Sequence, residues 1–238
     1  MADKKLRIFA GPNGSGKTTI IKEIQKLYNI CSFVNADYLQ EVLNRLHYFD
    51  YSLIYSEVIE NEEWIEFLQK QNRPASSHLR KILFSNFDLI SSESINGYDA
   101  AIISDFFRSK LLESDHSFSF ETVFSHESKI DFMREARTKG YKIYLYFICT
   151  QDPKVNIQRV KNRVLQGGHD VSKLKIESRY YRSLDLLYNA FLLSDREFII
   201  DTTIDKGDVI LEKNGPLVSL KVEQVSTWVD KYLLKYLD

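Results

Sequence analysis

The sequence has few cysteines, prolines and glycines. Among its 238 residues are two cysteines, four prolines and nine glycines. Cys31 and Cys149 lie far apart, each in an apolar run that favours a buried thiol, so no disulfide framework is expected. The low glycine and proline content excludes collagen-like and low-complexity architectures.

An excess of one charge and long apolar runs are also lacking. Lysine and arginine number 32 against 33 aspartates and glutamates, which gives a formal net charge of −1. A non-specific nucleic-acid-binding protein needs a strong basic excess, so a nucleic-acid partner is not expected, although a local basic face stays open. No run approaches the roughly 18 apolar residues of a membrane span, and the first residues lack the apolar segment of a signal peptide. We therefore expect a cytoplasmic protein with no membrane partner.

What the sequence does contain is enough apolar material for a large core. Hydrophobic residues make up 44% of the chain and charged residues 27%, which is typical of a globular protein. At about 150 residues per domain, the length allows one large domain or two small ones. We find no internal repeat and no linker long enough to separate two domains, so we expect one.

The spacing of apolar residues predicts alternating strands and helices. A strand over 6–10, a helix from Lys17 and a strand over 31–35 form a strand–helix–strand unit, which favours a parallel sheet. Segment 37–112 is mostly helical in pattern. Further strands are expected at 117–120, 141–149 and 197–200, helices at 128–139, 152–166 and 173–193, and a hairpin at 209–222 before a helix at 225–237.

The segment 11–18 matches the phosphate-loop pattern G-x-x-x-x-G-K-[ST]. Its glycines let successive backbone N–H groups point at an anion, and the following helix N-terminus adds partial positive charge. Lys17 would reach the β- and γ-phosphates, and the Thr18 hydroxyl would bind Mg²⁺. The spacing does not fit the dinucleotide pattern G-x-G-x-x-G. The residues expected to bind a nucleoside triphosphate are Gly11, Pro12, Asn13, Gly14, Ser15, Gly16, Lys17, Thr18 and Thr19.

Two acidic residues follow predicted strands, where ligands bind in open parallel sheets. Asp37 and Glu121 could each accept a proton from an attacking hydroxyl or hold polar groups of a substrate. Asp37 could equally cap a helix that begins at Tyr38, and Glu121 could be a solvent-facing acid. Asp105 and Asp201 also follow apolar residues, but Asp105 lies in a helical pattern and Asp201 can equally start a loop.

Arg159 and Arg163 lie one turn apart on the helix expected over 152–166, so they can address the same anion. Gly167 and Gly168 follow and suit the hinge of a moving lid. Such an arginine pair could close over ATP phosphates and stabilise the transferring group. The alternative interpretation is a solvated basic face.

Five motifs in this order resemble the zeta-toxin-like P-loop proteins, and most of all their bacterial branch of predicted ATPases. The motifs are Gly11 to Thr19, Val34 to Asp37, Phe120 to Thr122, Arg159 to Val171 and Arg179 to Leu184, within roughly residues 5–205. The resemblance implies a P-loop NTPase/kinase-like three-layer α/β fold with a mostly parallel central sheet. We expect a single domain over 1–238, with a helical insertion at about 40–115 and a hairpin plus helix at about 207–238.

The resemblance also implies ATP- and Mg²⁺-dependent transfer of the γ-phosphoryl group to a hydroxyl of a small molecule, which in the characterised toxins is UDP-N-acetylglucosamine. By position, Asp37 would be the base, and Glu121 with Thr122 would bind the acceptor. His169 stands where the toxins have another basic residue. Catalysis would further use Lys17 and the phosphate-clamping arginine, Arg159 or Arg163. A toxin of this type would have an antitoxin partner.

This chain departs from the family pattern at three positions. Val123 replaces a common Thr, His126 a common Gly and Ser172 a common Pro. The lost Thr hydroxyl concerns the acceptor more than the ATP site. An alternative function is an NTPase or regulatory ATP-binding protein without a small-molecule acceptor. A polynucleotide kinase is a further alternative, which the neutral charge disfavours.

Overall fold

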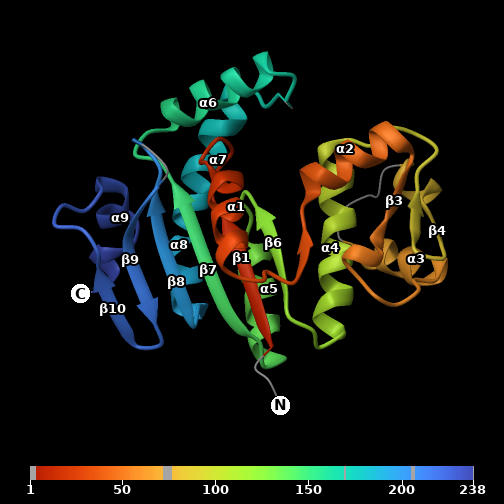
Figure 1. The fold of residues 1–238 in the computed structure, drawn as a ribbon, viewed down its shortest axis with the longest axis horizontal. Coiled ribbons are helices and arrows are strands. Elements are labelled where there is room, and N and C mark those ends of the chain that lie inside the picture. The colour runs from red at the N-terminus through yellow and green to blue at the C-terminus, as the bar shows by residue number, and fades with distance from the viewer. Residues whose placement is uncertain (1–3, 72–76, 169, 205–206, 238) are drawn as a thin grey trace. The chain divides into compact units, whose positions relative to one another are not determined.

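The computed structural model describes residues 4–71, 77–168, 170–204 and 207–237. They form two compact units (Figure 1). Residues 1–30 with 121–238 are the phosphate-loop unit, and residues 31–120 are the aromatic unit. The expectation of a single domain over 1–238 stays a prediction.

The phosphate-loop unit contains a sheet with the strand order β10-β9-β8-β7-β1, in which β8, β7 and β1 run parallel. The strands are β1 (Lys5–Ala10), β7 (Lys142–Cys149), β8 (Arg196–Asp201), β9 (Asp208–Asn214) and β10 (Leu217–Leu220). β7 pairs in parallel with both β1 and β8, whereas β9 and β10 form an antiparallel hairpin around Asn214 and Gly215. The predicted α/β class with a mostly parallel sheet is therefore confirmed.

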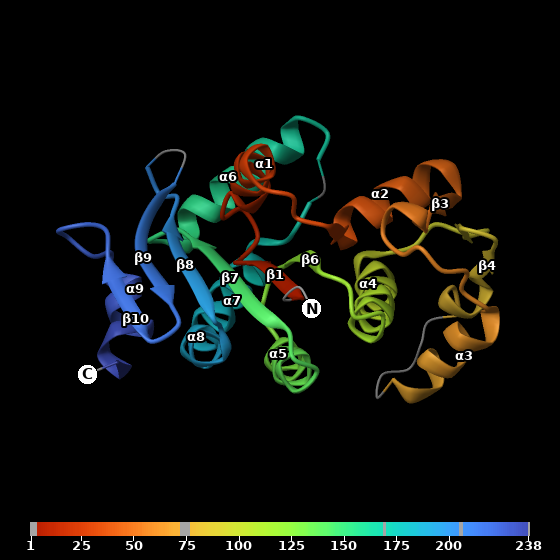
Figure 2. The ribbon, with the colours of Figure 1, turned by 60° about the horizontal axis from the view of Figure 1, so that its bottom comes forward.

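Helices lie on both faces of this sheet. They are α1 (Lys17–Leu27), α5 (Ser128–Thr138), α6 (Pro153–Leu165), α7 (Lys173–Asp185), α8 (Leu187–Leu193) and α9 (Thr227–Tyr232), with a 3₁₀ helix at Leu234–Tyr236. Figure 2 shows α1 on one side of the sheet and α5 and α8 on the other, which gives the unit three layers. The helix expected over 173–193 is two helices that meet at Leu186. Among the described residues, no helix combines the length and apolar character needed to cross a bilayer.

The core of this unit follows from strand composition. β7 is apolar on both faces, and its residues 145–149 are all buried, as expected for a central strand covered by helices on both sides. Asp152 caps α6 by accepting a hydrogen bond from the Lys154 N–H, and Pro153 occupies the first helical turn. The sequence signals for the start of α6 are therefore confirmed.

The aromatic unit combines helices with a small antiparallel sheet. Its elements are β2 (Ser32–Val34), α2 (Ala36–Leu46), β3 (Tyr48–Asp50), α3 (Asn61–Lys70), β4 (Leu83–Ser85), β5 (Asp88–Ile90) and α4 (Gly97–Glu113), with 3₁₀ helices at Tyr51–Leu53 and Leu79–Lys81. β2 pairs in parallel with β6 (Phe118–Thr122), and three strands form the sheet β3-β5-β4. The sequence did not predict this sheet, because three-residue strands carry too little periodicity to be recognised.

Aromatic rings fill the core of the aromatic unit. Trp64 packs on Phe84 and Phe106 with ring centroids 6.0 and 5.1 Å away, and Tyr51 packs on Phe84 at 5.7 Å. The side chains of Tyr51 and Trp64 are almost completely buried, and the indole N–H of Trp64 donates to the Leu79 carbonyl. These rings therefore form a packed hydrophobic core.

Candidate functional site

The segment 11–16 forms a tight loop between β1 and α1. The Gly11 N–H donates to the Thr122 carbonyl at 3.3 Å, and the Ser15 N–H donates to the Pro12 carbonyl at 3.2 Å. Gly14 has a φ of +77°, and a Cβ there would lie 2.5 Å from the Asn156 carbonyl oxygen. This backbone path therefore requires glycine at position 14.

Several polar groups of the loop have no partner among the residues that the structure describes. In the described part of the chain, the N–H groups of Gly14 and Gly16 donate to no other group. The Ser15 hydroxyl is fully buried and makes no hydrogen bond to any described residue. Because the N-terminus of α1 follows directly, these donors form a cradle with the polarity that a phosphate group needs.

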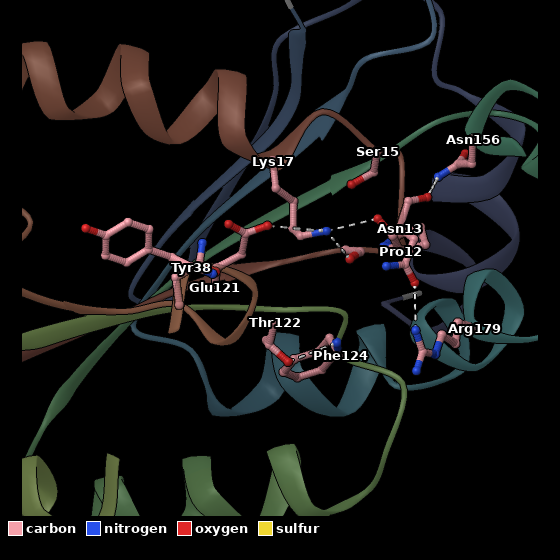
Figure 3. A network of polar contacts seen from close by, with 12 residues as sticks. Pro12, Asn13, Ser15, Lys17, Tyr38, Glu121, Thr122, Phe124, Asn156 and Arg179 are labelled. Atoms are coloured by element: carbon pink, nitrogen blue, oxygen red, sulfur yellow. Dashed lines mark hydrogen bonds and ion pairs between the residues drawn. The ribbon is translucent and has the colours of Figure 1, made fainter. Parts of the chain in front are cut away.

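The Lys17 ammonium is buried beside this loop. Its Nζ donates to the carbonyls of Gly11 at 2.8 Å and Pro12 at 3.0 Å and lies 3.8 Å from Oε1 of Glu121 (Figure 3). The side chains of Lys17 and Glu121 are only 7% and 15% exposed. Removal of two charges from water is costly unless they compensate each other, so this ion pair holds both groups in place. The structure thus brings together two of the predicted site residues.

The end of β6 is attached to the start of the loop through Thr122. Its carbonyl accepts the Gly11 N–H, and its hydroxyl oxygen accepts the Phe124 N–H at 3.1 Å. Phe124 is buried and has a φ of +58°, which is unusual for a bulky residue. The Thr122 hydroxyl therefore stabilises a turn beside Glu121 and retains its own proton for a further contact.

A set of contacts that the sequence did not predict centres on Asn13. The Asn13 carbonyl accepts a hydrogen bond from Nδ2 of Asn156 at 2.7 Å. The Asn13 Oδ1 atom accepts one from Nη1 of Arg179 at 3.1 Å (Figure 3). Asn156 is completely buried, and its own Oδ1 accepts a hydrogen bond from the Thr150 hydroxyl. Helices α6 and α7 thus each contribute one side chain to the tip of the loop.

The two predicted arginines of α6 have different surroundings. Arg159 donates from Nη1 to the Thr202 hydroxyl at 3.2 Å and from Nη2 to the Thr202 carbonyl. The Thr202 hydroxyl in turn donates to the Ser15 carbonyl at 2.8 Å, so Arg159 is linked to the loop through one residue. Arg163 lies one turn further along and is exposed. His169, the other predicted basic residue, lies outside the described residues.

Asp37 lies in the first turn of α2, in the aromatic unit, whereas Lys17 and Glu121 belong to the phosphate-loop unit. The cap of α2 is Asn35, whose side chain accepts the Tyr38 N–H at 3.1 Å, so the interpretation of Asp37 as the helix cap is wrong. The Asp37 carboxylate is exposed, and no described residue makes a hydrogen bond or ion pair with it. This carboxylate is therefore available to a ligand.

Two other aspartates have structural partners. Asp105 lies within α4 and forms an ion pair with Arg108 of the same helix. Asp201 ends β8 and accepts hydrogen bonds from the Ser226 hydroxyl at 2.7 Å and the Trp228 indole N–H at 2.8 Å. Burial alone would raise the pKa of Asp201, but these bonds together with those from Thr203 lower it below its ordinary value. Asp201 therefore attaches the C-terminal helix α9 to the sheet.

Thr18 is the predicted magnesium ligand. It lies in the first turn of α1, next to Lys17, and is exposed. In residues 4–71, 77–168, 170–204 and 207–237, no group of three or more His, Cys, Asp or Glu side chains could hold a metal ion. Mg²⁺ at a phosphate site takes most of its ligands from phosphate oxygens and water. A single hydroxyl oxygen in this position fits that donor set.

Comparison with known proteins yields fold relatives. No family model matches the sequence. A chain of the AvrRxo1-ORF1:AvrRxo1-ORF2 complex with sulphate ions superposes with a TM-score of 0.61 at 14% identity, over 97% of this chain and 64% of that one. A chain of the same complex with ATP superposes with a TM-score of 0.56 at 14% identity, over 92% of this chain and 61% of that one. A chain of the PezAT chromosomal toxin–antitoxin system of Streptococcus pneumoniae superposes with a TM-score of 0.53 at 13% identity, over 96% of this chain and 76% of that one.

A sequence relative covers a shorter stretch. An uncharacterized protein of Haemophilus influenzae is 32% identical over 63 residues, which are 26% of this chain and 45% of that protein. This chain thus spans less than two thirds of the AvrRxo1 chains and less than half of the Haemophilus protein. Relatives of such low identity show the fold. The resemblance that the motifs predict is confirmed at the level of the fold, which this chain shares with the AvrRxo1 and PezAT chains.

Proposed function

We propose that this protein is an ATP-dependent phosphotransferase that moves the γ-phosphoryl group of ATP to a hydroxyl of a small molecule. The observation that carries the proposal is the phosphate cradle. At the start of α1, the N–H groups of Gly14 and Gly16 donate to no described residue, and the buried Lys17 ammonium lies beside them. Its fold relatives include a complex with ATP, and the sequence motifs resemble kinases. Binding of the triphosphate would use residues 11–19.

Charge neutralisation is the principal chemistry such a site supplies, because little covalent work falls to the protein in phosphoryl transfer. Lys17 can exchange its contacts with the Gly11 and Pro12 carbonyls for phosphate oxygens, which are stronger acceptors. Thr18 would hold Mg²⁺, which neutralises phosphate charge when bound. Arg159 and Arg163 remain the proposed clamp on the transferring group, and Arg159 already reaches the loop through Thr202.

For the acceptor we propose Asp37 as the base, with Glu121, Thr122 and His169 as binding residues. The exposed Asp37 carboxylate has no partner among the described residues. A general base must be able to form a hydrogen bond with the hydroxyl that it deprotonates, and this carboxylate can do so. It follows β2 by three residues, and Glu121 directly follows Phe120, which pairs with Val34 of β2. A sugar nucleotide such as a UDP-sugar is the acceptor class that the resemblance favours.

A protein partner belongs to the same proposal. The AvrRxo1-ORF1 structures contain ORF2, and PezAT is a toxin–antitoxin system. By analogy of fold, we propose that an antitoxin binds this chain and blocks access to the phosphate loop.

The proposal is tested with labelled ATP, a panel of sugar nucleotides and nucleosides, and a small-molecule extract of cells. The wild-type protein should label one acceptor. Asp37→Asn should lower that transfer by about 10²- to 10⁴-fold, the usual contribution of a general base, without changing ATP affinity. Glu41→Gln, an exposed carboxylate on the same helix α2, serves as the control and should transfer at the wild-type rate.

An NTPase without an acceptor predicts the opposite pattern. ATP would then be hydrolysed at a steady rate with no acceptor present, no compound in the panel would take up label, and Asp37→Asn would hydrolyse ATP as fast as wild type. That result would replace the transferase by a regulatory ATP-binding protein.

A further inference from the structure

One arginine approaches the phosphate loop directly, and it is neither of the two on α6. Arg179 of α7 donates from Nη1 to Oδ1 of Asn13 at 3.1 Å, and its side chain is half-buried. The next residue, Tyr180, is buried and donates its hydroxyl to the Thr150 carbonyl at 2.6 Å, at the end of β7. Because Tyr180 holds α7 to the sheet, the position of Arg179 is set by the fold and not by chance contact of a surface side chain.

The contact lies where the terminal phosphate is expected. Asn13 stands between Pro12, whose carbonyl accepts the Lys17 ammonium, and Gly14, whose N–H donates to no described group. In phosphate loops this lysine reaches the β- and γ-phosphates. Figure 3 shows Lys17, Asn13 and Arg179 at the loop. The Arg179 guanidinium therefore approaches the loop next to the atoms that would surround the γ-phosphate.

The chemistry of the present partner suggests that it is exchangeable. Asn13 offers a neutral amide oxygen, whereas a phosphate oxygen is charged and accepts a hydrogen bond roughly twice as strong. A guanidinium carries five N–H donors in a planar fork, so it can bind phosphate oxygens with two of them. Arg159, by contrast, is held by the Thr202 hydroxyl and by carbonyl oxygens of Thr202 and Thr203.

We propose that Arg179 is a catalytic residue that binds the γ-phosphoryl group of ATP, and that Asn13 holds its guanidinium in position before the nucleotide binds. This inference rests on the proposed function. In the transfer, the bond from the acceptor oxygen to the γ-phosphorus forms as the bond to the β,γ-bridging oxygen breaks. The bonding electron pair leaves with ADP, the hydroxyl proton goes to Asp37, and Arg179 stabilises the charge without exchanging a proton.

The test is a comparison of ATP and ADP affinities by titration calorimetry for the wild-type protein, Arg179→Gln and Arg179→Lys. If Arg179 binds the γ-phosphate, Arg179→Gln should weaken ATP binding by about tenfold or more and change ADP affinity less than twofold, since ADP lacks that group. Arg179→Lys should be intermediate, because it keeps the charge and loses the fork. Transfer to the acceptor should fall by about 10³-fold in Arg179→Gln.

The matched control is Arg182→Gln, on the same helix. Arg182 is exposed and donates from Nε to the Ser178 carbonyl of its own helix, so its loss should change neither affinity. Thermal unfolding of each variant verifies that it is folded. If Arg179→Gln does not fold, the comparison of ATP and ADP affinities is made with Arg179→Lys.

Three outcomes would overturn the inference. Equal weakening of ATP and ADP in Arg179→Gln would mean that Arg179 only shapes the loop through Asn13. Unchanged ATP and ADP affinities in both Arg179 variants would mean that Arg179 takes no part in nucleotide binding. A wild-type protein that binds neither nucleotide would overturn the proposed function as well, which distinguishes that failure from the other two.

Discussion

Both units of this protein bury aromatic rings and polar side chains, but the buried polar side chains near the phosphate loop are bonded to that loop or to its neighbours. Buried polar groups in the phosphate-loop unit include Lys17, Asn156 and Thr202, and each of them makes hydrogen bonds to the loop or its neighbours. The aromatic unit buries rings such as Trp64 and Phe84. A buried polar group is costly unless it is bonded, whereas a buried ring stabilises by packing alone. The polar groups bonded to the loop support the proposed phosphate site in the first unit, and the packed rings stabilise the second unit.

Removal of the central ring of the aromatic unit should have the largest effect on stability. Trp64 is 1% exposed, and Trp64→Ala should lower the free energy of unfolding by about 3–5 kcal/mol, measured by urea denaturation. Ile65→Ala is the control, because the neighbouring Ile65 is 50% exposed and should cost about 0.5 kcal/mol. If folded Trp64→Ala also lost ATP affinity, the aromatic unit would have a role beyond packing.

A change in the loop itself should affect both stability and ligand binding. Gly14→Ala introduces a methyl group 2.5 Å from the Asn156 carbonyl at a φ of +77°, so we expect a loss of about 2–4 kcal/mol and much weaker ATP binding. Gly215→Ala is the control, because Gly215 has a φ of +58° and an added Cβ there would meet no atom within 4 Å. This variant measures the backbone strain alone, so it should lower the free energy of unfolding by about 1 kcal/mol and leave ATP affinity unchanged. Equal losses of stability and of ATP affinity in the two variants would show that contact with the Asn156 carbonyl does not restrict position 14.

A pH-dependent effect is expected from a buried acid away from the loop. Glu197 on β8 is fully buried and accepts a hydrogen bond from the Ser194 hydroxyl at 2.8 Å. Burial raises its pKa from 4.5 to about 8, against smaller opposing effects of Ser194 and Lys213. Between these values the folded state binds more protons than the unfolded state, so the free energy of unfolding should fall as pH rises, by up to about 1.4 kcal/mol per pH unit.

Unfolding curves of Glu197→Gln between pH 5 and 8 measure this contribution, because glutamine cannot titrate and the slope should flatten. Asp201 on the same strand is the internal contrast. Its pKa is lowered, so its contribution is present at neutral pH and is lost only as the solution becomes strongly acidic. A wild-type slope that persisted in Glu197→Gln would assign the pH dependence to another group.

Local sequence signals predicted part of the site and missed the rest. The pattern over 11–18, the Asp152-Pro153 start of α6 and the strand expected over 117–120 could be recognised because each depends on residues close in sequence. The end of that strand was predicted too early, because β6 continues through Glu121 to Thr122. Asp37 was identified as a candidate, but its alternative role as a helix cap was wrong, since Asn35 competes successfully for that position. The sheet β3-β5-β4 was missed, because its strands are too short to show a period.

By itself, the sequence determined the phosphate loop, the α/β class and the order of the main elements. Turn chemistry and apolar periodicity act over a few residues and can therefore be recognised without a fold. Only the tertiary structure decided that Asn156 and Arg179 meet Asn13, over separations of 143 and 166 residues. A contact at that separation depends on how helices pack on the sheet, and no neighbouring residue in the sequence indicates that Arg179, and not another arginine, reaches Asn13.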